Sequence, residues 1–260
     1  MVNLSFTLGQ FEMLLTIFVR ITAFIFAAPF FNLRGIPRKV KIALGAAVAC
    51  MLYTVLPQTT LEYNTVLGYG IIIIKEAIVG VSLGFVADIC NQIIMLAGKL
   101  IDTDIGLSMV MVFDPVSNNS SSVSGVLYNN FLMMLLIITN MHQYILRALV
   151  DSYKVVPING LNFNYSKLYA TVLKFMSDYM MIGFRIVLPI FACMLIINLI
   201  LGILAKVAPQ LNMFAVGIQI KLLVGLIVLY LTITLLPDIA EFIFTQMKEM
   251  MVMMLESLYN

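Results

Sequence analysis

The chain has 260 residues, of which 62% are hydrophobic and only 11% are charged, and its mean hydropathy is +1.05. Because soluble domains carry roughly 25% charged residues, this composition excludes a soluble globular protein and predicts a polytopic membrane protein. The net charge of +2, without a long basic run, indicates no nucleic-acid partner.

The first apolar segment, Phe11 to Phe31, is long enough to cross a hydrocarbon core of about 30 Å and contains Arg20. A basic cluster without an acid follows it, which the positive-inside rule places on the cytoplasmic side: Arg34, Arg38, Lys39 and Lys41. The next apolar segment, residues 42–56, is short for a simple span. Its small residues suit close contact with another helix.

One long helix is expected from Val66 to Leu96, although it contains Lys75, Glu76 and Asp88. Charges inside apolar segments are costly in lipid, so each needs a partner. We predict that a set of such charges forms pairs between helices or between subunits: Arg20, Lys75, Glu76, Asp88, Arg185, Lys206 and Lys221. The alternative is a stand-alone secondary transporter with an ion site at Lys75, Glu76 and Asp88. A transporter should have two similar halves with matched broken helices, and the halves of this chain do not match.

Residues 80–84 read Gly-Val-Ser-Leu-Gly, which matches the G-x-S-x-G pattern of serine hydrolases. That nucleophile requires a turn between a strand and a helix, whereas this match lies inside an apolar helix. Gly80 and Gly84 instead indicate close helix packing. The single histidine and three scattered cysteines have no metal-ligand spacing, and no P-loop is present. We therefore predict no enzyme, no catalytic residue, no metal and no cofactor.

The middle of the chain alternates apolar and polar stretches. Residues 107–113 are apolar and rich in methionine, and Asp114-Pro115 then starts a polar stretch rich in serine and asparagine. From the residues alone, this is a helix end followed by a disordered loop. An apolar helix is expected from Val126 to Thr139 and onward to Val150. Residues 151–174 are the least apolar and are expected outside the apolar core.

Two apolar segments close the chain, residues 180–205, with a kink at Pro189, and residues 213–236. Residues 238–259 predict an amphipathic helix with a group of methionines, lying against protein or the membrane surface. The expected fold is all-α, with helical hairpins whose helices are kinked and interrupted. Because several segments are too short or too charged to lie alone in lipid, we expect an obligate subunit of a larger complex.

The stretch from Lys206 to Lys221 is the most informative part of the chain. Pro209, Gln210 and Asn212 interrupt two apolar segments, and the apolar run resumes at once, with Lys221 inside it. This stretch, with Leu201-Gly202 before it, resembles the signature of the FliR/SctT family, export-gate subunits of flagellar and virulence type III secretion. The signature residues in this sequence are Pro209, Asn212, Phe214 and Gly217, and Lys206 stands where the family often has arginine. The resemblance extends to an Arg20…Pro29…Pro37 pattern and a Gly106…Asp114-Pro115 loop.

The resemblance implies a subunit of the flagellar export gate, in the bacterial inner membrane and the flagellar basal body. Such a chain would complete a helical channel with FliP-like and FliQ-like subunits, in contact with membrane lipid. FlhB-like and FlhA-like components would lie on the cytoplasmic side, and unfolded flagellar proteins would pass through the centre. Residues 1–175 would then be a FliP-like part, and residues 176–260 a FliQ-like hairpin with the C-terminal amphipathic helix.

The resemblance also assigns a role to residues 106–122, as a plug loop that seals the channel at rest and moves aside for substrate. Methionine side chains are soft and adaptable, which suits a seal that must let diverse chains pass. The residues of this sequence on that loop are Gly106, Met109, Met111, Phe113, Asp114 and Pro115.

Overall fold

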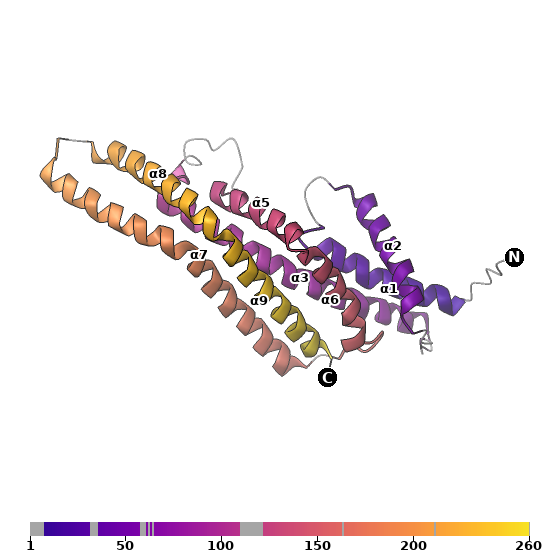
Figure 1. The fold of residues 1–260 in the computed structure, drawn as a ribbon. Helices are drawn as coiled ribbons and strands as arrows, with labels where there is room; N and C mark the ends of the chain where they lie inside the picture. Colours follow the sequence, from indigo (N-terminus) through magenta and orange to yellow (C-terminus); the bar gives the residue numbers. More distant parts are fainter. Residues whose placement is uncertain are drawn as a thin grey trace. The chain divides into compact units, whose positions relative to one another are not determined.

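A computed structural model describes residues 8–31, 36–57, 61, 63, 65–109, 122–162, 164–210 and 212–259. The helices follow one another as α1 (Leu8–Ala27), α2 (Arg38–Val55), α3 (Val66–Ile105), α5 (Val123–Ile138), α6 (Met141–Val155), α7 (Tyr165–Val207), α8 (Met213–Thr232), the 3₁₀ turn η2 (Ile233–Leu235) and α9 (Leu236–Leu258) (Figure 1). These described segments contain no β-strand, which confirms the predicted all-α fold.

Four helices in the described part of the chain are long and apolar enough to cross a membrane, and a fifth span results if α5 and α6 form one broken span. The polytopic architecture is therefore confirmed. Interrupted helices are also present. Asn140 separates α5 from α6 in a left-handed conformation with a φ of 57°, and η2 separates α8 from α9.

Three helices differ most from the sequence prediction. α3 continues beyond Leu96 to Ile105, because the carboxylate of Asp102 finds hydrogen-bond partners inside the protein. The predicted continuous helix from Val126 to Val150 is two helices, since asparagine tolerates the left-handed conformation that breaks it. α7 begins at Tyr165, well before the apolar run at residue 180, and it continues through Pro189.

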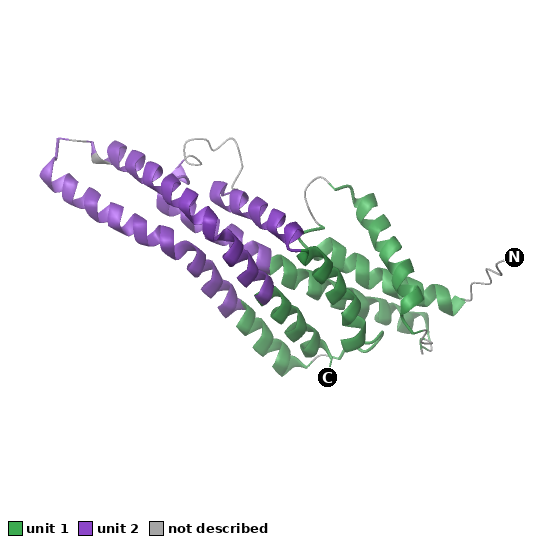
Figure 2. Ribbon diagram, in the orientation of Figure 1, with its two compact units in different colours: residues 1–89, 140–175, 246–260 green, residues 90–139, 176–245 purple. Residues whose placement is uncertain are grey.

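The chain divides into two compact units (Figure 2). Unit 1 comprises residues 1–89, 140–175 and 246–260, and unit 2 comprises residues 90–139 and 176–245. Three long helices, α3, α7 and α9, each contribute residues to both units. The predicted division near residue 175 concerns likeness to partner subunits rather than internal contacts, and it stays a prediction.

The core of unit 1 is built around α1, α2 and the first part of α3. Ile17, Ile21 and Phe24 of α1 are completely buried, as are Val79 and Leu83 of α3. The predicted close packing at the two glycines is confirmed. A Cβ atom on Gly80 would lie 2.2 Å from the carbonyl oxygen of Arg20, and one on Gly84 would lie 2.5 Å from the Cβ of Ala27. Hence α1 and α3 approach each other as closely as backbones allow.

The end of α9 also belongs to unit 1, and its methionines face inward. Met247, Met250, Met251 and Met254 are buried, whereas Val252 is exposed. The amphipathic helix predicted for the C-terminus therefore buries its apolar face against protein within the chain.

Unit 2 contains a second close contact between backbones. A Cβ atom on Gly98 of α3 would lie 2.1 Å from the Cα of Gly125 on α5, so only glycine fits there. Gly225 of α8 is in similarly tight contact with Ile105, where a Cβ would lie 2.5 Å from a side-chain carbon. These contacts place the beginning of α5 directly against the last turns of α3.

Candidate functional site

The largest completely buried side chain among the described residues of unit 1 is that of Arg20, which has 0% exposure. Its Nε donates to Oε2 of Glu76 at 2.5 Å, and Glu76 is only 1% exposed. Arg20 lies on α1 and Glu76 on α3, so the ion pair joins two helices. These two charges are therefore paired with each other between two helices of one chain.

Arg20 donates three further hydrogen bonds. Nη1 donates to Oγ of Ser152 at 3.3 Å, and both Nη1 and Nη2 donate to the carbonyl oxygen of Val156 at 3.1 Å. The guanidinium carbon lies 4.0 Å from the ring centroid of Tyr153, whose hydroxyl donates to the carbonyl of Ile17. Arg20 therefore binds α6 and the start of the following loop to α1.

The second carboxylate oxygen of Glu76 is also satisfied. It accepts a hydrogen bond from the backbone N–H of Asn159 at 3.0 Å, and Asn159 has a left-handed φ of 64°. The side-chain oxygen of Asn159 in turn accepts from Nζ of Lys75 at 3.1 Å. Lys75 and Glu76 thus reach the same loop residue although adjacent helical side chains do not face each other.

These contacts bear on the alternative of a transport site at Lys75, Glu76 and Asp88. A transport site needs ionisable groups that exchange an ion or proton with a path. Glu76 is instead buried, and each of its two carboxylate oxygens already accepts a hydrogen bond, one from Arg20 and one from Asn159. Lys75 and Asp88 are half-buried. The arrangement around Glu76 favours a structural brace.

Ser82, the serine of the hydrolase-like pattern, lies in the middle of α3. Its hydroxyl is buried and donates to the carbonyl of Val79 at 2.9 Å, one turn earlier in the same helix. It is therefore not exposed at a sharp turn, as a nucleophile elbow requires.

Replacing Ser82 with alanine should leave the amount and the melting temperature of the protein unchanged, because only a bond within the helix is lost. Labelling of the purified chain with a fluorophosphonate probe for nucleophilic serines, before and after the substitution, should give no signal that depends on Ser82. Labelling that Ser82→Ala abolishes would instead give the serine a chemical role.

In unit 2, the structure gives Asp102 a role that the sequence did not predict. Its carboxylate is 3% exposed and accepts from Oγ of Ser122 at 2.7 Å and from the backbone N–H of Ser124 at 3.2 Å. Ser122 is the N-cap of α5, and its hydroxyl oxygen accepts from the N–H of Gly125. Asp102 therefore belongs with the groups that begin α5.

Two of the predicted plug residues are described by the structure. Gly106 has a φ of 94°, a conformation that favours glycine, and it ends α3. Met109 is exposed. Met111, Phe113, Asp114 and Pro115 lie outside the described residues. The assignment of this segment as a plug stays a prediction.

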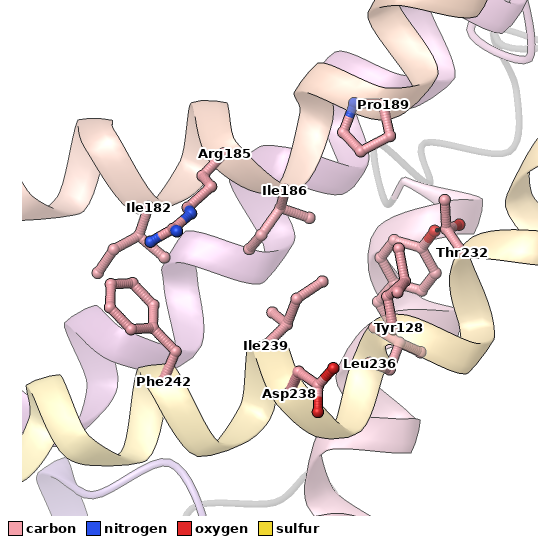
Figure 3. A pocket seen from close by; sticks show the side chains of 11 residues that line it. Tyr128, Ile182, Arg185, Ile186, Pro189, Thr232, Leu236, Asp238, Ile239 and Phe242 are labelled. Atoms are coloured by element: carbon pink, nitrogen blue, oxygen red, sulfur yellow. Dashed lines mark hydrogen bonds between the residues drawn. The ribbon is translucent and has the colours of Figure 1, made fainter.

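A pocket of about 330 Å³ lies in unit 2, between α5, α7 and α9 (Figure 3). Most of its walls are apolar, and Arg185 on α7 and Asp238 on α9 also line it. The guanidinium of Arg185 lies 5.1 Å from the ring centroid of Phe242 (Figure 3). Pro189 also lines the pocket, inside α7. Because proline has no N–H, it donates no helical hydrogen bond to the carbonyl of Arg185, one turn earlier. Arg185 is exposed on this chain, and its pairing with another subunit stays a prediction.

The signature residues lie at the turn between α7 and α8. Asn212 is the N-cap of α8 and accepts from the N–H of Ala215 at 3.4 Å. Phe214 is 66% exposed, and Pro209 is exposed, whereas Gly217 is buried against the side chain of Leu201. Lys206 is exposed, and Lys221 is half-buried and close enough to interact electrostatically with Asp104.

Comparison with known proteins identifies the family of the chain. The sequence pattern described as "Bacterial export proteins, family 1" matches residues 11–247. A flagellar biosynthetic protein FliR of Pectobacterium carotovorum subsp. carotovorum is 33% identical, with 90% of this chain and 89% of the relative covered. FliR of Bacillus subtilis is 27% identical over 93% of both chains, and FliR of Escherichia coli is 26% identical, covering 88% and 87%. The chain therefore belongs to the bacterial export proteins of family 1, the family of the flagellar biosynthetic proteins FliR.

Proposed function

We propose that the chain is a subunit of the flagellar type III export gate in the bacterial inner membrane. It joins FliP-like and FliQ-like subunits in a helical channel, which lets unfolded flagellar proteins cross. FlhB-like and FlhA-like components bind the same assembly from the cytoplasmic side. The chain itself catalyses no reaction and requires no cofactor.

The observation that supports this proposal is the exposed apolar surface of α7 and α8. Only 22% of the spanning window of α7 is buried within the chain. The exposed residues run along its second half and continue on α8: Leu188, Leu195, Leu199, Ile203, Phe214, Leu223 and Ile227. Lys206 and Arg185 interrupt this surface with positive charges. Lipid alone is a costly environment for such charges, so partner helices are the better neighbours.

A protein surface also suits the turn between α7 and α8. Asn212 caps the N-terminus of α8, and the apolar side chain of Phe214, two residues later, is exposed. Exposed aromatic residues close to polar backbone breaks are typical of positions that another protein covers. We therefore assign the exposed signature residues Pro209, Asn212 and Phe214 to subunit contacts, whereas Gly217 packs within the chain.

We further propose that residues 106–122 form the seal of the channel at rest. Both ends of this segment come from unit 2, where α3 ends and α5 begins. Gly106 turns the chain away from α3, and the methionine-rich sequence that follows offers soft side chains for a seal.

The subunit role is tested by native mass spectrometry of the chain co-expressed with its neighbouring membrane subunits in mild detergent. A hetero-oligomer that contains one copy of the chain is expected. A stable monomer or homodimer would contradict the proposal and return attention to an ion site at Lys75, Glu76 and Asp88.

The seal is tested by deleting residues 110–118. The complex should still assemble, because the helix packing described for both units is made by other residues, and the cells should leak ions. Membrane potential measured with a fluorescent dye reports the leak, and the full-length chain at equal expression is the control. A deletion that assembles without leak and without a change in secretion would refute the plug.

A further inference from the structure

The pocket of about 330 Å³ in unit 2 has two oppositely charged side chains at its opening. Arg185 of α7 and Asp238 of α9 both line the pocket, and both are exposed, so they lie where the pocket meets its surroundings. No residue in the described part of the chain forms a salt bridge with either of them. The opening therefore presents one cation and one anion to a ligand.

The guanidinium of Arg185 keeps its hydrogen-bond donors available. Its carbon atom lies 5.1 Å from the ring centroid of Phe242, a cation–π contact that engages none of the N–H groups (Figure 3). Among the described residues, none accepts a hydrogen bond from this guanidinium. The planar fork of N–H donors in arginine matches the oxygens of a phosphate group. Arg185 is therefore suited to bind a phosphate at the opening.

The buried walls of the pocket have no polar group to offer a ligand. The hydroxyls of Tyr128 and Thr232 bond to each other at 2.7 Å, and the Thr232 hydroxyl also donates to the carbonyl of Leu229 at 2.8 Å. The other buried walls are aliphatic, with Ile186 and Leu236 among them. Because a polar group buried there would lose its hydrogen bonds to water, an alkyl chain fits these walls best.

The two charges also lie at the end of an uncharged part of the chain. Residues 186–205, which follow Arg185, contain no charged residue, and neither do residues 222–237, which precede Asp238. About 20 apolar residues in a helix span a hydrocarbon core of about 30 Å. Charged side chains at the ends of such stretches lie at the level of the lipid headgroups. The opening of the pocket is therefore expected beside the polar part of the lipid.

We propose that this pocket binds a phospholipid of the phosphatidylethanolamine class. One acyl chain enters between α5, α7 and α9, Arg185 binds the phosphate, and Asp238 accepts a hydrogen bond from the ammonium group. Hydrocarbon is a costly environment for Arg185, whereas a phosphate is a strong acceptor for it. The inference goes beyond the proposed function and does not depend on it.

The two charges select this headgroup among the common phospholipids. Phosphatidylethanolamine carries a phosphate and an ammonium group on a short ethylene link, so it matches both Arg185 and Asp238. Phosphatidylglycerol has no cation and would leave Asp238 without a partner. The quaternary ammonium of phosphatidylcholine has no N–H to donate to a carboxylate.

Photo-cross-linking tests the site, with a phosphatidylethanolamine that carries a diazirine at the end of one acyl chain. The probe is added to the chain in nanodiscs, in the assembly in which it is purified, and labelled peptides are identified by mass spectrometry. Labelling should concentrate on the pocket walls around Ile186 and Ile239 rather than along the exposed Leu195 and Leu199 of α7. Ile239→Trp, which fills the pocket, should remove most of the pocket labelling. Labelling spread evenly along α7 would show contact with bulk lipid only and would overturn the site.

Competition by unlabelled lipids measures recognition of the phosphate. Arg185→Ala should weaken competition by phosphatidylethanolamine by at least about tenfold, the size of a lost charge-assisted hydrogen bond. Lys167→Ala is the matched control, since Lys167 is an exposed cation of α7 that does not line the pocket. If Arg185→Ala does not accumulate, Arg185→Lys, which keeps the charge without the planar fork, should weaken competition less. Unchanged competition in the Arg185 variant would overturn the assignment of the phosphate.

The ratio of two lipids measures recognition of the ammonium group. Phosphatidylethanolamine should compete better than phosphatidylcholine, and Asp238→Asn should remove most of this preference. Asp238 also lies in the first turn of α9, where a negative charge suits the helix dipole, so the variant is judged by the lipid ratio rather than by stability. Glu241→Gln is the matched control, because Glu241 is exposed on α9 and does not line the pocket.

Two further results would overturn the proposal. Equal competition by phosphatidylethanolamine, phosphatidylcholine and phosphatidylglycerol would overturn the assignment of the headgroup. Labelling of the pocket in the isolated chain but not in a complex with other subunits would show that a partner protein occupies the pocket. Arg185 would then pair with that partner and not with a lipid.

Discussion

Replacing Arg20 with methionine should destabilise unit 1 strongly. The substitution removes the ion-pair partner of a carboxyl group that is only 1% exposed, so Glu76 stays buried with a single hydrogen bond, from the backbone of Asn159. Breaking a buried ion pair on one side costs about 3–5 kcal/mol. A domain has only about 5–15 kcal/mol of stability in total, so this loss is a large fraction. Bonds from α1 to Ser152 and Val156 disappear at the same time.

Thermal unfolding of the purified complex in detergent measures the effect, together with the amount of complex recovered. The double variant Arg20→Met/Glu76→Gln should recover much of the loss, because it leaves no unpaired charge and glutamine can still accept from Asn159. Lys75→Met is the matched control, since Lys75 is half-buried and makes one bond to Asn159. An Arg20→Met complex with an unchanged melting temperature would show that the pair contributes little.

Export should follow stability in this series. If Glu76 were an ion-coupling group, the double variant would be stable but inactive, because its carboxylate is gone. We expect the double variant to regain motility along with its melting temperature. This comparison separates the brace from the transport alternative within a single set of variants.

The sequence predicts the buried charges better than it predicts their partners. Arg20 and Glu76 stand out because charge is costly inside apolar segments, and that reasoning needs no structure. Their partners Ser152, Val156 and Asn159 lie far along the chain and carry no such signal. In the sequence, Asn159 is recognisable only as a turn residue. Its backbone N–H donates a hydrogen bond to Glu76 only in the folded chain.

The helix boundaries lead to the same conclusion: those set by the local sequence are predictable, and those set by contacts with distant residues are not. Length and hydropathy predict α1 and α8 well, because lipid and protein interiors both require apolar residues. When only polarity is considered, α3 is expected to end before Asp102, yet the helix includes this residue because Ser124 of α5 supplies a hydrogen-bond donor. No proline or glycine marks the helix break at Asn140 in the sequence. The break occurs because asparagine adopts the left-handed conformation there.

Gly80→Ala should also destabilise unit 1 strongly, although it adds one methyl group. That methyl would lie 2.2 Å from the carbonyl oxygen of Arg20, a backbone atom that cannot move without shifting α1. Overpacking of this kind costs about 1–3 kcal/mol, and more when backbone must move. Gly84→Ala meets the Cβ of Ala27 at 2.5 Å and should behave in the same way. Melting temperature and complex recovery measure both variants.

Gly70→Ala is the matched control, because it lies on the same helix and a Cβ there has no atom within 4 Å. Alanine favours the helix by up to about 1 kcal/mol over glycine, so this variant should be neutral or slightly stabilised. Gly80 contacts the backbone of the very residue whose side chain binds Glu76. Shifting α1 at Arg20 therefore weakens the ion pair as well, and the losses from Gly80→Ala and Arg20→Met should be less than additive. Fully additive losses would show that the glycine contact and the ion pair stabilise the helix pair independently.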